Sequence, residues 1–151
     1  MKKLTILLLS VLLPVCLPAQ PDEPTLTGEQ EAAVLAAANS WFEVALTGAS
    51  LSRLMSLSDV PFSFDGERIL ATYTELEETF AAVFEEKGLR EVPRYTSFVQ
   101  SYTMGNALLC IPINAAVVKL QTKDDDGDGK SIIVAVLLKD NTCKVVGFND
   151  F

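Results

Sequence analysis

The sequence predicts an α+β fold, a single domain in which helices pack on one face of a curved, mainly antiparallel sheet. Three features lead to this prediction. Apolar residues recur at three- and four-residue spacing in the first part of the chain, they follow a two-residue period in the second part, and the connections between the later segments are short. Helices followed by a run of sequential strands are typical of this class.

The first residues predict an exported protein. MKKLTILLLSVLLPVCLPAQ has two lysines, an apolar run from Leu4 to Leu17 and a small residue, Ala19, which are the parts of a secretory signal peptide. The run is too short to span a bilayer core of about 30 Å. We therefore expect a signal peptide over residues 1–19, no stable membrane span, and a periplasmic or extracellular location in a bacterium.

A lipoprotein signal is the alternative interpretation of the same segment. In such a signal a cysteine, here Cys16, becomes lipidated, and a small residue precedes it. Val15 is bulkier than the glycine, alanine or serine expected at that position. Cleavage after Ala19 is therefore favoured over lipidation.

The composition excludes several kinds of function. The chain has 12 basic and 20 acidic residues and a formal net charge of −8, which becomes about −10 when Lys2 and Lys3 leave with the signal peptide. This excess of negative charge repels nucleic acids and anionic membrane surfaces. The chain contains no histidine, which excludes a histidine triad, a histidine zinc site and imidazole acid–base catalysis.

The mature chain begins with a tether and a helix. Residues 20–26, QPDEPTL, are polar and proline-rich and predict a flexible tether before a domain over 27–151. Thr27 and Gln30 have the spacing of a capping box, which marks a helix start. Gly48 is a C-cap signal at the other end. The inward apolar stripe of this helix comprises Val34, Leu35, Ala38, Trp41, Phe42, Ala45 and Leu46.

A short helix, a hairpin and a second long helix follow. We expect the short helix over Leu51–Leu57, and a hairpin over Val60–Leu70 because VPFSFDGERIL alternates with a period of two around Asp65-Gly66, a two-residue turn signal. Thr72 and Thr74 each have a glutamate three residues later, so either residue is a candidate cap for the next helix. That helix is expected to end at Gly88 and to bury Leu76, Phe80, Val83 and Phe84.

The sequence after Pro93 predicts strands. A turn is expected at Gly105-Asn106 and another at Asp140-Asn141. The segment ALLCIPIN is ambiguous between an edge strand, a bulge and a loop, because Pro112 cannot donate a ladder hydrogen bond. The conformation of 104–114 is therefore left open. The expected strands are Arg94–Thr103, Ala115–Lys123, Ser131–Lys139 and Thr142–Phe148.

Strict alternation assigns the side chains of the first of these strands to two faces. Phe98 and Tyr102 then share one face, and Tyr95 lies on the opposite face. The segment SIIVAVLLK is apolar on both faces, whereas a strand covered on one side only would alternate with polar residues. We expect a second copy of the chain to cover the outer face, giving a homodimer. Cover by the tether or by ALLCIPIN is the alternative.

Two cysteines, Cys110 and Cys143, remain in the mature chain, and an even number suggests a disulfide. The expected register pairs Cys143 with Leu138, and pairing of Lys123 with Lys130 places Leu138 opposite Ala115. Cys110 is five residues from Ala115, and at about 3.3 Å per residue it then lies about 16 Å from Ala115 along the strand. A disulfide needs Cα atoms within about 7 Å, so we expect no disulfide unless Pro112 turns the chain back.

The acidic stretch KDDDGDGK, residues 123–130, raises the question of calcium. Asp124, Asp126, Asp128 and Gly129 match the first half of an EF-hand loop, but the twelfth position, where a bidentate acid belongs, is Ala135. The flanking segments are strands instead of helices. We therefore predict a solvated turn with no metal site, and no cofactor elsewhere.

The order of elements resembles the nuclear transport factor 2-like superfamily, which includes SnoaL-like and ketosteroid isomerase-like domains. The resemblance covers nearly the whole mature chain and is carried by SDVPFSFDGERI, INAAVVKLQTK and SIIVAVLLKDNTCKVVGF. It implies a cystatin-like cone with a pocket between helices and sheet, and dimerisation through the outer sheet face. Candidate pocket residues are Trp41, Phe62, Phe64, Phe80, Phe84, Phe98, Tyr102 and Asp59.

Two functions are consistent with these observations. The favoured one is a non-catalytic exported domain that binds a small apolar or amphipathic ligand or mediates protein association. The alternative, implied by the resemblance, is an isomerase, dehydratase or cyclase that uses Asp and Tyr in an apolar cone, where burial raises the pKa of an acid. No catalytic residue is assigned. The arginines have two interpretations, a site for an anionic ligand or surface ion pairs with the many glutamates. The acid–base candidates are Asp59, Tyr73, Tyr95, Tyr102 and Asp150, and the arginines are Arg53, Arg68 and Arg94.

Overall fold

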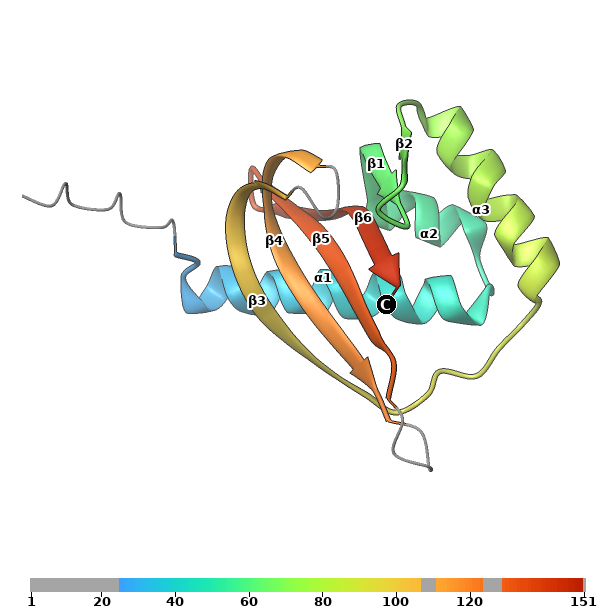
Figure 1. The fold of residues 1–151 in the computed structure, drawn as a ribbon, viewed down its shortest axis with the longest axis horizontal. Coiled ribbons are helices and arrows are strands. Elements are labelled where there is room, and N and C mark those ends of the chain that lie inside the picture. The colour runs from blue at the N-terminus through green and yellow to red at the C-terminus, as the bar shows by residue number, and fades with distance from the viewer. Residues whose placement is uncertain (1–24, 107–110, 124–128, 151) are drawn as a thin grey trace, which may run out of the picture.

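The computed structural model describes residues 25–106, 111–123 and 129–150, and the side chains of 103–106 and 111–114 lie outside this description. The described part forms one domain in which three helices cover one face of a curved sheet (Figure 1). The helices are α1 (Gly28–Thr47), α2 (Leu51–Leu57) and α3 (Tyr73–Lys87). The predicted α+β class is therefore confirmed.

The sheet has six strands in the order β2-β1-β6-β5-β4-β3. All neighbouring pairs are antiparallel except β1 and β6, which run parallel. The sheet is therefore mixed but mainly antiparallel, as predicted. The strands are β1 (Ser58–Phe64), β2 (Arg68–Leu70), β3 (Tyr95–Asn106), β4 (Ile111–Thr122), β5 (Ser131–Lys139) and β6 (Thr142–Asp150).

Both long helices begin at the capping boxes that the sequence contains. The Thr27 side chain accepts a hydrogen bond from the Gln30 backbone, and the Gln30 side chain accepts one in return. Of the two candidate caps for α3, Thr72 is the one used, with Glu75 as its partner. The chain leaves α1 at Gly48 in the left-handed region, with φ of 63°.

The hairpin formed by β1 and β2 has a longer turn than predicted. Phe64 pairs with Arg68, so three residues separate the strands, and Asp65 and Gly66 both have positive φ. The hairpin is also part of the main sheet, because β1 runs beside β6 with Ser58 aligned to Val145. This long-range parallel pairing places the hairpin against the helices.

The turn predicted at Gly105-Asn106 is wrong. Both residues belong to β3, where Asn106 pairs with Ile111 and a register irregularity falls between Met104 and Asn106. Pro112 lies inside β4. A bulge accommodates an extra residue without ending the strand, so glycine here marks an irregularity and not a chain reversal.

A second irregularity overturns the predicted faces of β3. Val99 and Ser101 pair with successive residues of β4, which leaves Gln100 as an extra residue. Beyond a bulge the alternation of side chains shifts by one. Tyr95 and Tyr102 therefore both pack against the core beneath the helices, whereas Phe98 lies on the outer face with 43% of its surface exposed. The prediction that Phe98 and Tyr102 share a face is wrong for this reason.

The predicted register between β4 and β5 is wrong by one residue. Ala116 pairs with Val136 and Gln121 with Ser131, and Thr122, instead of Lys123, exchanges hydrogen bonds with Lys130. Between β5 and β6 the predicted pairing of Leu138 with Cys143 is confirmed.

Two further predictions fall on segments outside the described residues. Cys143 has no disulfide partner among the described residues, but Cys110 is not described, so the absence of a disulfide between the two stays a prediction. Asp124, Asp126 and Asp128 are likewise not described, and the choice between a turn and a calcium loop stays open to test. Among the described residues, no helix is long and apolar enough to cross a membrane.

The main core lies between α1 and the inner face of the sheet, and Trp41 is at its centre. The indole is 2% exposed and its Nε1–H donates to Ser58 Oγ at 2.9 Å. The Ser58 hydroxyl in turn donates to the Leu54 carbonyl at 2.8 Å. This chain of hydrogen bonds links α1, the middle of α2 and the start of β1.

A smaller apolar cluster lies on the outer face of the sheet. Ala135 pairs with Gly147 of β6, and its side chain is fully buried. Because the small residues are covered by their larger neighbours, part of this face is already buried within one chain. We call this apolar cluster the outer-face cluster. Its residues are Ala115, Ile133, Ala135, Leu137 and Val146.

Replacement of Ser58 by alanine is expected to lower the free energy of unfolding by about 1–3 kcal/mol, because the buried Trp41 N–H loses its acceptor. Urea denaturation followed by Trp41 fluorescence measures the change. The matched control is Ser56→Ala, since the exposed Ser56 hydroxyl donates only to the Arg53 carbonyl. Equal stability of the two variants would contradict this role of Ser58.

Candidate functional site

The best candidate site is an apolar cavity of about 110 Å³ between the helices and the edge of the sheet. Residues from α1, α2, α3, β1 and β6 line it, together with one residue of the loop after α3. We call it the aromatic cavity. Its lining residues are Trp41, Phe42, Ala45, Leu46, Leu54, Phe64, Phe80, Val83, Phe84, Lys87, Arg90 and Phe148.

The floor of the aromatic cavity is rigid and apolar. Trp41, Phe42 and Phe80 are at most 3% exposed, and Leu54 is fully buried. The rings meet mainly edge to face or tilted, for example Phe64 against Phe148 at 5.0 Å between centroids. Such packing fixes the rings, so an apolar ligand would enter a preformed site.

The mouth of the aromatic cavity is cationic. The face of α3 that lines the cavity has residues at three- and four-residue spacing, namely Phe80, Val83, Phe84 and Lys87. The first three are apolar and the last is a lysine. Arg90 lies in the loop after α3 and lines the same cavity. Both cations are exposed, and no carboxylate occurs among the described residues that line the cavity.

The ends of α1 and α3 are packed together beside this mouth. A side chain added at Gly48 would meet the Gly88 carbonyl oxygen at 3.2 Å and the Phe84 ring at 3.8 Å. Gly48 and Gly88 both have positive φ, which glycine adopts without strain. The close approach of the two glycines therefore fixes where α3 ends and where Lys87 lies.

The residues proposed from the sequence separate in space. Trp41, Phe64, Phe80 and Phe84 line the aromatic cavity. Phe62 is fully buried beside it and contacts the rings of Trp41 and Phe80. Phe98, Tyr102 and Asp59 lie elsewhere.

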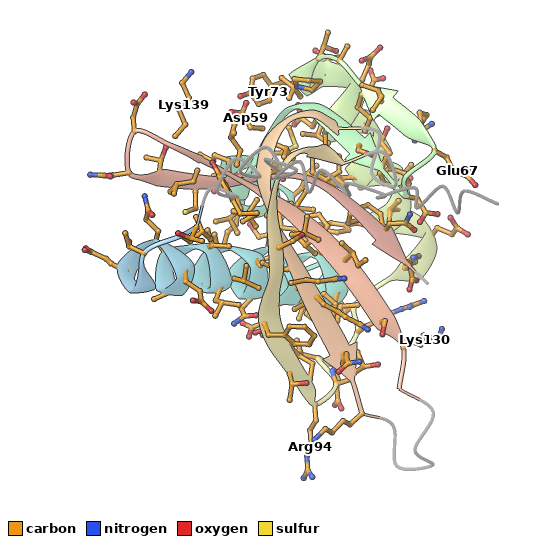
Figure 2. All side chains as sticks on the ribbon, turned by 60° about the vertical axis from the view of Figure 1, so that its left-hand side comes forward. Asp59, Glu67, Tyr73, Arg94, Lys130 and Lys139 are labelled. Atoms are coloured by element: carbon orange, nitrogen blue, oxygen red, sulfur yellow. The ribbon has the colours of Figure 1, made fainter. Side chains whose placement is uncertain are left out.

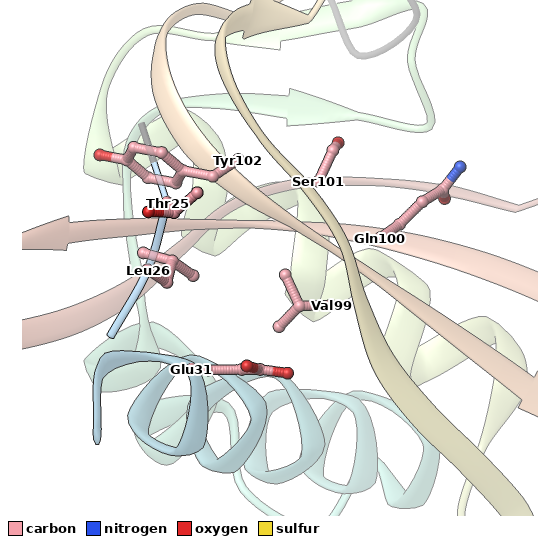
Figure 3. Close-up of a pocket in the computed structure, with 7 residues that line it drawn as sticks. All are labelled: Thr25, Leu26, Glu31, Val99, Gln100, Ser101 and Tyr102. Atoms are coloured by element: carbon pink, nitrogen blue, oxygen red, sulfur yellow. The ribbon is translucent and has the colours of Figure 1, made fainter. Parts of the chain in front are cut away.

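Tyr102 lines a different cavity of about 220 Å³, between the start of α1 and the bulged part of β3. Figure 3 shows Leu26 and Thr25 beside the Tyr102 ring, with Glu31 at the α1 side. The bulge at Gln100 turns Tyr102 toward this space. The lining mixes polar and apolar side chains, so it offers no continuous apolar floor.

Asp59 and Tyr73 form a pair on the surface, as Figure 2 shows. The Tyr73 hydroxyl donates to Asp59 Oδ1 at 2.5 Å, and the Val60 N–H donates to the same oxygen at 2.8 Å. The hydrogen bond to Asp59, some burial and the charge of Asp59 raise the pKa of Tyr73. Tyr73 is 53% exposed, so this pair lies outside the apolar interior that acid–base chemistry on an apolar substrate would require.

Tyr95 also pairs with an acid, at the opposite end of the sheet. Its hydroxyl donates to Glu43 Oε1 at 2.7 Å, and its ring packs edge to face on Phe42. Burial, the hydrogen bond to Glu43 and the charge of Glu43 raise the pKa of Tyr95 to about 12. A phenol held neutral in this way joins α1 to β3.

The three arginines proposed as an anion site do not share a cavity. Arg53 lines a space beside Ser50 and Thr47 at the junction of α1 and α2. Arg68 lies over the Phe64 ring at 5.2 Å and donates to Thr79. Arg94 lies directly before the first residue of the edge strand β3 (Figure 2). Among the described residues, no three Asp, Glu, His or Cys side chains gather as a metal site.

Sequence reasoning missed Lys87 and Arg90. Lys87 lies seven residues after Phe80 on the inward stripe of α3, and this spacing was a usable signal. Arg90 is beyond the helix, where periodicity carries no information, and only the path of the loop brings it to the cavity.

Replacement of Glu43 by glutamine is expected to lower the pKa of Tyr95 from about 12 while leaving it above the usual value near 10, because burial still disfavours the phenolate. The folded pKa exceeds the unfolded one, so the stabilisation from this group is full below about pH 10 and is lost as the pH rises toward 12. Ultraviolet titration of the tyrosines measures the shift, with Tyr95→Phe to identify the transition. An unchanged titration in Glu43→Gln would contradict the pairing.

Comparison with known proteins confirms the fold. No protein-family model and no curated protein matches this chain. A solved protein from a Streptomyces species is similar with a TM-score of 0.51 at 9% identity, covering 85% of this chain and 94% of its own. A Nostoc punctiforme protein of unknown function with a cystatin-like fold matches with a TM-score of 0.50 at 13% identity, covering 83% and 92%.

A nuclear transport factor 2-like protein of unknown function from Methylobacillus flagellatus is also similar, with a TM-score of 0.48 at 10% identity over 85% of this chain and 98% of its own. At such identities the likeness concerns the fold alone. The comparison therefore confirms the expected cystatin-like fold, and the activity has to be argued from the cavity.

Proposed function

We propose that this protein is exported and binds a small apolar molecule in the aromatic cavity without transforming it. The observation that supports the proposal is the floor of buried rings under a cavity with no carboxylate among its described lining residues. Concave apolar sites with few polar groups are typical of small-molecule binding.

The cavity favours binding over catalysis because the groups that move protons lie elsewhere. Isomerase chemistry of the kind implied by the resemblance needs a carboxyl or phenol facing the substrate. Asp59 and Tyr73 pair on the surface, and Tyr95 is held by Glu43. None of these residues lines the aromatic cavity.

The size of the cavity limits the ligand. An apolar cavity of about 150 Å³ accommodates benzene, and the aromatic cavity has about 110 Å³. The aromatic cavity is smaller, so it suits a short alkyl chain, or a single ring that lies partly in the mouth. A steroid-sized molecule would require the helices to move apart.

Native mass spectrometry of the protein purified from its own host tests both parts of this proposal. An exported chain that has lost residues 1–19 begins at Gln20, and its denatured mass reports the cleavage. A reproducible small adduct on the native species supports binding. A chain that keeps its first residues would overturn the export proposal.

Replacement of Ala45 by phenylalanine is expected to abolish binding of a small apolar probe such as 1-hexanol, because the new ring fills the cavity that Ala45 lines. The free energy of unfolding should fall by no more than about 3 kcal/mol, the usual limit for an added core group, since the ring enters existing space. Quenching or enhancement of Trp41 fluorescence reports binding, and Trp41 is the single tryptophan of the chain.

The matched control for this variant is Ala82→Phe, which places the same ring on the exposed face of α3. Ala82→Phe should bind the probe like the parent. Equal binding by Ala45→Phe and the parent would remove the aromatic cavity as the ligand site.

A second function, self-association, is supported by the outer face of the sheet. Phe98, an aromatic side chain that is 43% exposed, lies on the same outer face as the outer-face cluster, with Lys119 of β4 between it and Ile133 of β5. Partly exposed apolar side chains on one sheet face, Phe98 on β3 and Ile133 and Leu137 on β5, are suited to a twofold contact between identical chains. We propose that this face forms the homodimer contact.

Replacement of Phe98 by glutamate is expected to convert the dimer to a monomer, because two like charges would face each other across a twofold contact. Sedimentation velocity measures the change, and circular dichroism checks that the fold is kept. Ala82→Glu adds the same charge on a helix away from this face and should remain dimeric. A parent protein that sediments as a monomer would contradict self-association.

A further inference from the structure

We infer that the ligand of the aromatic cavity is an anion, the carboxylate of a small apolar acid, with its tail on the aromatic floor and its head group between Lys87 and Arg90. This inference rests on the proposed binding function and adds the chemical class of the ligand. The single feature that carries it is the placement of two cations at the mouth of an apolar cavity in an acidic protein.

The placement of Lys87 has a partial explanation that involves no ligand. A cation in the last turn of a helix stabilises the helix dipole, and Lys87 is the basic residue in the last turn of α3. That explanation does not extend to Arg90, which lies past the C-cap Gly88. Both residues nevertheless line the same cavity.

Neither cationic side chain is paired with an acidic side chain of the described residues. Glu85, Glu86 and Glu91 are neighbours in sequence, yet within the described part of the chain the side chains of Lys87 and Arg90 take part in no hydrogen bond or ion pair. In a chain with a net charge of −8, two unpaired cations beside one apolar opening create a local preference for anions.

The chemistry of the two side chains favours a carboxylate. A guanidinium offers two parallel N–H donors that match the two oxygens of a carboxylate, and the lysine ammonium adds a point charge. The apolar floor extends the contact to a ring or short chain. A neutral alcohol of equal length would fill the same space but would gain nothing from the cations.

Matched pairs of probes test the inference. Hexanoate and 1-hexanol, and benzoate and benzyl alcohol, are titrated into the full mature protein at pH 7 and low salt, with Trp41 fluorescence or calorimetry as the readout. We expect each carboxylate to bind roughly five- to tenfold more tightly than its alcohol, the effect of two solvent-exposed charge contacts. Added salt should reduce this ratio.

Charge variants assign the effect to the two residues. The double variant Lys87→Gln with Arg90→Gln should lower the ratio of carboxylate to alcohol affinity to about one, because only the carboxylate gains from the two charges. Lys87→Glu with Arg90→Glu should reverse the preference, so that hexylammonium binds more tightly than hexanoate. Lys139→Gln, which removes a cation at the far hairpin (Figure 2), should keep the ratio of the parent.

The outcomes separate this inference from the proposed function. Alcohols that bind as tightly as carboxylates would overturn the anionic ligand and leave apolar binding intact. A carboxylate preference that survives the glutamine double variant would overturn the assignment to Lys87 and Arg90. If neither probe of either pair binds, and Ala45→Phe changes nothing, the proposed function itself fails.

Discussion

The burial of Trp41 is the constraint on which the rest of the structure depends. Its ring contacts Phe62 of β1, Phe80 of α3 and Phe148 of β6, so one side chain joins four elements that are far apart in sequence. An indole N–H cannot be buried cheaply without an acceptor, and Ser58 supplies one at the first residue of β1. That bond sets the position of β1 beside β6, which in turn holds α3 against α1.

The aromatic cavity is a consequence of this arrangement. Large rings on α1, α3, β1 and β6 converge from four directions, and planar side chains that meet at steep angles leave space that aliphatic side chains would fill. The same geometry keeps the space rigid. A cavity bounded by fixed rings on one side and by two cations on the other selects ligands by shape and by charge.

The fold alone does not decide the activity. The similar solved structures include proteins of unknown function, and the likeness is confined to architecture. In this chain Asp59 and Tyr73 pair with each other on the surface, Tyr95 pairs with Glu43, and Tyr102 lines a different cavity. The interior is left to aromatic packing, which explains why binding is the better supported function.

The sequence by itself determined the local features of this protein. The capping boxes at Thr27 and Thr72, the helix ends at Gly48 and Gly88, the hairpin around Asp65 and the α+β class all follow from spacing and turn chemistry, which depend on neighbours in the chain. The tertiary structure alone decided the parallel pairing of β1 with β6 and the bulge at Gln100. This bulge places Phe98 and Tyr102 on opposite faces of the sheet. The tertiary structure also brought Arg90 to the aromatic cavity, beside residues of α1 and β6. These features arise from contacts between distant residues, and a local pattern holds no information about which distant segment will supply the partner.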